Sequence, residues 1–158
     1  MLWISAGCCA AIAAWASQAS TPVIRPQSVY VASFGEKPGA DQLRQSFIES
    51  LKRSSNLTLA DSAQKADAVV SGAGEVWVKG YYTLNPRQRM YSADARRVYA
   101  GQLSLEMKDK RNETIWSCQI PPPIEGEDAP RTMASQAVKK LVAALDKMPA
   151  APAQRGAR

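Results

Sequence analysis

The chain has 158 residues, enough for one globular domain and too few for two of ordinary size. Its 20 Lys and Arg against 14 Asp and Glu give a formal net charge of +6, and it contains no histidine. The missing histidine excludes Ser–His and Cys–His nucleophile pairs and every His-ligated metal site. With 46% hydrophobic and 22% charged residues, the composition is that of a folded globular protein.

The first residues have the pattern of an export signal. Residues 2–15 are uncharged and largely apolar, and residues 14–16 supply the small-x-small pattern that a signal peptidase needs. The run is too short to cross a bilayer, which takes about 20 helical residues. We therefore expect residues 1–16 to be a signal peptide, and we expect a location in the periplasm or at the outer membrane.

Two alternatives to cleavage remain open. Residues 5–8 form a degenerate acylation box that would place a lipid on Cys8, although a leader of only seven residues would then be removed. A retained anchor is the other alternative. If the leader is removed, Cys118 is the single remaining cysteine, so no internal disulfide is expected.

The first half of the mature chain alternates strands with one helix. A polar, proline-containing lead-in over 17–27 comes first. The apolar spacing and β-branched content then predict a strand over 28–34, a helix over 41–53, a short strand over 57–59 and a longer strand over 68–78. We expect Asp41 to cap the helix.

The second half begins with an insert over 83–97 that is rich in arginine and tyrosine and predicts a loop. It is followed by a strand over 98–108, a polar turn, a partner strand over 113–120 and an amphipathic helix over 132–147. We expect Thr132 to cap this helix, and the Pro/Ala/Arg tail 148–158 to be disordered.

These elements predict an α+β domain over 28–147. Their order is β-α-β-β-β-β-α, and each helix carries one apolar stripe. A mixed, mostly antiparallel sheet of about five strands with both helices on one face buries both stripes. We expect a single domain.

Three stretches resemble small bacterial envelope domains. They are residues 29–35, which end in Phe34-Gly35, the helix around 43–51, and the Ala-Asp-Ala-Val-Val-Ser-Gly run 66–72. The pattern is similar to that of curli-secretion lipoproteins, penicillin-binding-protein activator lipoproteins and the amino-terminal domain of the Tol-Pal translocation protein. The resemblance implies an envelope domain that binds proteins and carries out no chemistry.

The insert and the two tyrosines that precede it supply the candidate binding residues, which combine guanidinium groups with tyrosine rings: Arg87, Arg89, Arg96, Arg97, Tyr81, Tyr82 and Tyr91. Guanidinium groups bind phosphates and carboxylates in forked pairs, and tyrosines add rigid contact area. We expect an envelope protein, an anionic envelope polymer or lipid headgroups as partner, and no nucleic acid. A solvated loop without a partner is the alternative.

The other chemically notable residues predict no active site. Cys118 lies on the apolar face of a predicted strand, and we expect it to be a structural thiol because no imidazole is present to activate it. Glu125, Glu127 and Asp128 lack the spacing of a calcium loop, and Gly72-x-Gly74 lacks the third glycine of a dinucleotide site. We expect no metal and no cofactor.

The sequence therefore predicts an exported, non-catalytic binding or assembly module of the bacterial cell envelope. One alternative is a peripheral protein that binds anionic headgroups. Another is a small enzyme that uses carboxylates or Cys118.

Overall fold

The computed structural model describes residues 24–82, 96–123 and 128–149. The expected signal peptide 1–16, and most of the tail 148–158, lie outside these ranges. The elements follow one another along the chain as β1 (Ser28–Val31), α1 (Ala40–Ser54), β2 (Thr58–Leu59), a 3-10 turn (Ala63–Lys65), β3 (Ala68–Tyr82), β4 (Arg96–Asp109), β5 (Thr114–Ile120) and α2 (Ala129–Leu145).

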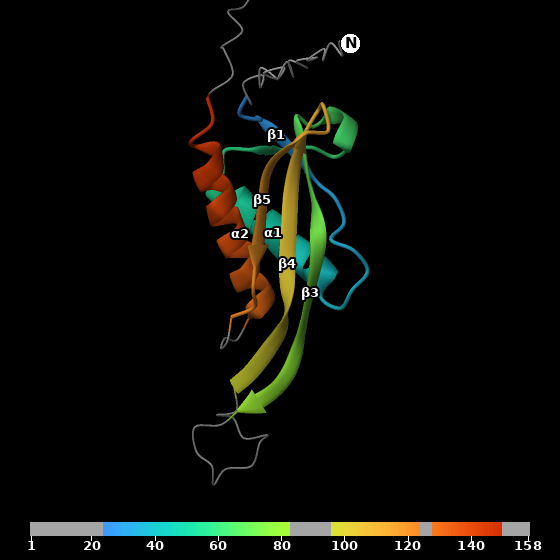
Figure 1. Ribbon diagram of the computed structural model, residues 1–158, viewed down its shortest axis with the longest axis vertical. Helices are drawn as coiled ribbons and strands as arrows, with labels where there is room; N and C mark the ends of the chain where they lie inside the picture. The colour runs from blue at the N-terminus through green and yellow to red at the C-terminus, as the bar shows by residue number, and fades with distance from the viewer. Residues whose placement is uncertain (1–23, 83–95, 124–127, 150–158) are drawn as a thin grey trace, which may run out of the picture.

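The strands form one open, mixed sheet in the order β2-β1-β3-β4-β5. β1 runs parallel to both β2 and β3, whereas β3, β4 and β5 are antiparallel to their neighbours. Both helices lie on the same face of the sheet (Figure 1). This arrangement confirms the predicted single α+β domain and its element order.

The core lies between the sheet and the two helices. On β4 the predicted alternation is confirmed, because Leu103, Leu105 and Met107 are buried. The rings of Phe34 and Phe47 pack edge to face with centroids 5.8 Å apart. The helices add apolar side chains that are fully or almost fully buried, among them Leu43, Leu51, Met133, Ala137 and Leu141.

Both predicted helix caps are wrong. α1 begins after Gly39, whose φ of 79° is left-handed, and no side chain caps it, so Asp41 lies within the first turn. α2 begins three residues earlier than expected, because Asp128 Oδ1 accepts a hydrogen bond from the Arg131 N–H at 3.1 Å. Pro130 fits this first turn because the N–H that proline lacks has no helical partner there.

The central hairpin is longer than predicted. β3 continues to Tyr82 and β4 starts at Arg96, with Tyr81 opposite Arg97 and Tyr82 opposite Arg96. The expected loop boundary is therefore wrong at its C-terminal end, since residues 96 and 97 belong to a strand. A register shift between Val78 and Gly80 marks a bulge in β3.

Gly101 allows β4 to pass close to β3. Its φ is 139°, and a Cβ atom there would collide with the carbonyl oxygen of Glu75. Gly80 lies in the same hairpin, but a Cβ built on it meets nothing within 4 Å.

We expect Gly101→Ala to lower the free energy of unfolding by at least about 2 kcal/mol, because the strained backbone and the collision act together. Gly80→Ala should change it by less than about 0.5 kcal/mol. Urea denaturation of the two variants measures this difference. Equal midpoints for the two variants would show that β4 does not depend on the glycine.

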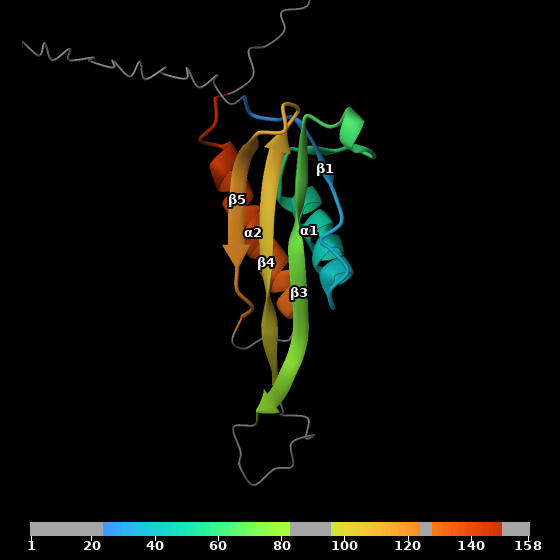
Figure 2. The same cartoon turned by 45° about the vertical axis from the view of Figure 1, so that its right-hand side comes forward.

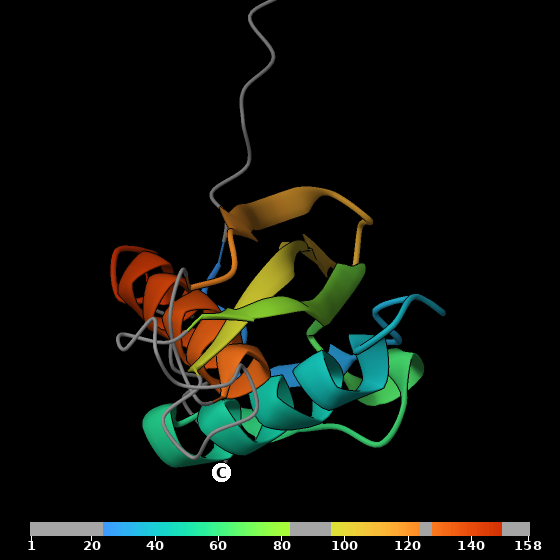
Figure 3. The same cartoon turned by 90° about the horizontal axis from the view of Figure 1, so that it is seen from below.

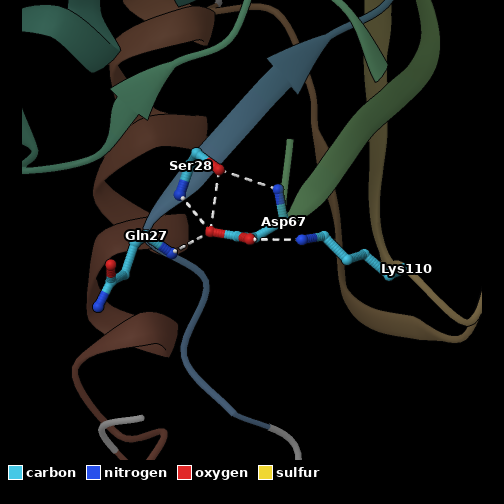
Figure 4. Close-up of polar contacts among 4 residues, drawn as sticks. All are labelled: Gln27, Ser28, Asp67 and Lys110. Carbon is cyan, nitrogen blue, oxygen red and sulfur yellow. Dashed lines mark hydrogen bonds and ion pairs between the residues drawn. The ribbon is translucent and has the colours of Figure 1, made fainter. Parts of the chain in front are cut away.

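A carboxylate holds three segments together at one end of the sheet (Figure 4). Asp67 Oδ2 accepts hydrogen bonds from the Gln27 N–H, the Ser28 N–H and the Ser28 hydroxyl at 3.2, 3.0 and 2.9 Å. Asp67 Oδ1 pairs with Lys110 Nζ at 2.9 Å, in the turn between β4 and β5. The pKa of Asp67 is lowered from 3.8 to about 2. The contact with Lys110 has the largest effect, and the hydrogen bonds from Ser28 and Gln27 add to it, whereas desolvation acts in the opposite direction.

We expect Asp67→Asn to destabilise the protein by about 1 kcal/mol at pH 7, a value reduced for solvent screening because the carboxylate is 37% exposed. The contribution of Asp67 is fully present above its ordinary pKa of 3.8 and is lost as the pH falls through about 2. Urea midpoints of parent and variant should therefore converge between pH 5 and pH 2. Asp61→Asn, on the exposed turn that follows β2, is the control. A gap that stays constant over this range would contradict the assignment.

Candidate functional site

The far end of the central hairpin projects beyond the rest of the domain (Figure 2). β5 pairs only with residues 103–108 of β4. On the other side, the last backbone bond to β3 runs from the Val76 N–H to Pro38 O at 2.9 Å. We call residues 77–82 and 96–102 the arm. In the described part of the chain, no strand pairs with either outer edge of the arm.

The arm exposes apolar side chains on both of its faces. Trp77, Val78 and Tyr81 are 45%, 39% and 42% exposed, and the only other large apolar side chain exposed among the described residues is Ile24. Val76 is buried beneath the helices, so the next residue, Trp77, points to the opposite face and Val78 to the helix side. The arm therefore exposes an aromatic ring on one face and an aliphatic side chain on the other.

The arm is also cationic. It contains Lys79, Arg96 and Arg97 and no acidic residue. A hydrogen bond to the hydroxyl of Tyr99, with a smaller effect of Tyr81, raises the pKa of Arg97. At the base of the arm, the carboxylate of Glu75 is paired with Lys37 Nζ at 3.0 Å, so it leaves the charge of the arm uncompensated.

The structure brings together four of the predicted binding residues. Tyr81, Tyr82, Arg96 and Arg97 meet as two cross-strand pairs at the end of the ladder. The other predicted residues, Arg87, Arg89, Tyr91 and the lipidation candidate Cys8, lie outside the described ranges.

Sequence reasoning missed Trp77 as a candidate binding residue. It was assigned to a strand, and a half-buried strand normally places such a ring in the core. The available signal was the run of residues 76–82, which continues with β-branched and aromatic side chains beyond the point where the flanking strands can reach.

The acidic candidates are separated by the structure. Asp128 caps α2, whereas Glu125 and Glu127 lie outside the described residues. Within the described ranges no group of three or more Cys, Asp or Glu side chains is placed to hold a metal ion. Neither α1 nor α2, the helices of the described chain, has the length and apolar character needed to span a membrane.

Comparison with known proteins gives structural likenesses only. No family model and no curated protein matches the chain. A PelC dodecamer from Paraburkholderia phytofirmans is 17% identical, with 78% of this chain and 92% of that chain covered and a TM-score of 0.46.

Two further structures are similar. For the uncharacterised lipoprotein B from Nitrosomonas europaea the identity is 12%, the coverage 75% and 81%, and the TM-score 0.43. A minor lipoprotein from Acinetobacter baumannii is 11% identical, with 79% of this chain and 98% of that chain covered and a TM-score of 0.43. Likenesses this distant carry no argument about function, and the resemblance to the three envelope families stays a prediction.

Cys118 is half-buried on the helix side of β5, opposite Leu105. Burial raises the pKa of its thiol, and the opposing effects of the Lys140 ammonium and a backbone hydrogen bond with Leu105 are smaller. The thiolate, which is the nucleophilic form, is therefore disfavoured near neutral pH.

We expect Cys118 to react with iodoacetamide at pH 8 roughly tenfold more slowly in the folded protein than in urea, because burial limits both ionisation and access. The Cys8→Ser/Cys9→Ser variant restricts the reaction to this thiol, and mass spectrometry follows the alkylated fraction. Equal rates in the folded and unfolded states would show that the fold does not protect Cys118, and a faster rate in the folded state would show an activated thiol.

Proposed function

We propose that this chain is an exported, non-catalytic binding or assembly module of the bacterial cell envelope, and that the arm contacts an acidic protein partner. The observation that carries the proposal is a two-stranded ribbon that leaves the domain with exposed aromatic rings, only cationic charges, and outer edges with which no strand of the described chain pairs. Export and the envelope location rest on the leader pattern of residues 1–16.

The side chains of the arm suit recognition. Trp77 and Tyr81 offer large, rigid contact area at low entropic cost, which is typical of the residues that dominate protein interfaces. Arg96 and Arg97 offer forked donors to carboxylates. Long-range attraction would bring an acidic partner to the arm, and the aromatic rings would then be buried.

The strand edges favour a protein over a lipid. Each outer edge of the arm presents backbone N–H and C=O groups without a strand partner among the described residues. An extended segment of another protein can satisfy them by adding a strand, which lipid headgroups cannot do. Binding to anionic headgroups is the second candidate, and the positive charge of the arm is the feature that favours it.

Site-specific photocross-linking tests the proposal. We expect Tyr81→p-benzoylphenylalanine to give a covalent adduct of defined mass with one protein in cell-envelope extract. The same photoreactive residue at Gln45, on an exposed turn of α1, should give none. The adduct should fall at least fivefold when Arg96→Glu and Arg97→Glu are added, and persist with Lys52→Glu and Lys147→Glu, which change the net charge equally.

Two results would overturn this assignment. Adducts of equal yield from positions 81 and 45 would show that the arm is not the contact surface. No protein adduct, together with binding to phosphatidylglycerol vesicles that weakens as salt rises, would favour the headgroup alternative.

A further inference from the structure

A polar groove lies between α1 and α2, which are separate elements from the arm. The two helices lie side by side (Figure 3). Side chains from the C-terminal end of α1 and the N-terminal half of α2 line this open hollow, whose volume is about 450 Å³. All eight lining residues are polar and none is acidic.

Three cations converge on this groove: Arg53 from α1, and Arg131 and Lys139 from α2. Within the described ranges, none of them forms an ion pair. Arg53 Nε donates to Glu49 O at 3.3 Å, which leaves its two terminal nitrogens available. Three like charges around one hollow repel one another, and a bound anion would relieve this repulsion.

The floor of the groove contains an unsatisfied donor. Ser50 is 4% exposed, and its hydroxyl is the only buried side-chain N or O atom without a hydrogen-bond partner among the described residues. A serine inside a helix usually donates to the carbonyl four residues earlier, and a buried hydroxyl rarely remains unpaired. Ser54, Ser135 and Thr132 also line the groove, and the hydroxyl of Thr132 donates to Asp128 O at 2.9 Å.

We propose that this groove binds a phosphate ester, with Arg53, Arg131 and Lys139 around the phosphate and Ser50 as the donor on the floor. A phosphate dianion presents several acceptor oxygens, which suits two guanidinium forks and surrounding hydroxyls better than a singly charged carboxylate does. The volume lies within the roughly 300–1,000 Å³ of small-molecule sites, so it accommodates the ester group as well. The inference is independent of the proposed role of the arm.

Calorimetric titration of the full chain with glycerol 3-phosphate tests the proposal, with glycerol as the uncharged reference. The dissociation constant should rise at least tenfold in Arg53→Gln/Arg131→Gln. It should stay within twofold in Lys52→Gln/Lys147→Gln, which removes the same charge at exposed positions outside the groove. Equal weakening in both variants, or no specific effect with any probe, would overturn the proposal.

Ser50→Ala separates a binding role from a structural one. Removing an unpaired buried hydroxyl should leave the fold intact, which thermal unfolding checks, whereas glycerol 3-phosphate binding should weaken about threefold if the hydroxyl donates to the ligand. An unchanged dissociation constant would overturn the assignment of Ser50.

Vesicles distinguish the source of the phosphate. The same variants are sedimented with phosphatidylglycerol and with phosphatidylcholine vesicles. If Arg53→Gln/Arg131→Gln loses binding of free glycerol 3-phosphate but keeps binding to phosphatidylglycerol vesicles, the ligand is a soluble ester. If the same variant loses binding to phosphatidylglycerol vesicles but keeps binding of free glycerol 3-phosphate, the ligand is a lipid headgroup. The arm is unchanged in all of these variants, so vesicle binding through the arm would persist equally in each.

Discussion

The ladder between β3 and β4 is the constraint on which the rest of the domain depends. It runs from Ala68 opposite Asp109 to Tyr82 opposite Arg96, with one register shift between Val78 and Gly80. β1 and β5 pair only with its first half, and β2 pairs with β1. Gly72 and Gly74 face Leu105 and Leu103 across it, where a Cβ on Gly72 would collide with the β4 backbone. The two strands can therefore approach closely beneath the helices.

The fold could be predicted from the sequence because its local signals agree with one another. The alternation over residues 103–107 defines the buried face of β4, and the apolar spacing within each helix defines one stripe. Packing both helices on one face of a single sheet is the simplest arrangement that buries both stripes. The first residue of each helix was harder to predict, because Asp41, Asp128 and Thr132 are all of residue types that cap helices. Only the backbone geometry shows which of them precedes a helix.

The end of the hairpin was predicted less well for a related reason. Tyrosine favours a strand but arginine does not decisively, so the extension of β4 back to Arg96 depends on its pairing with Tyr82. The arm combines aromatic and cationic side chains in either description, and its role as a binding site stays a prediction. The groove between the helices was beyond sequence reasoning, because Ser50 and Arg131 belong to elements far apart in the chain and each alone is an ordinary helical residue.

The separation of the arm from the core has an evolutionary consequence. The exposed side chains of the arm add little to the buried apolar surface, which is concentrated between the helices and the first half of the ladder. Substitutions of these side chains are therefore nearly neutral for folding and can accumulate freely. Under the proposed function, descendants of one ancestral domain can thus acquire different specificities while their interiors diverge slowly.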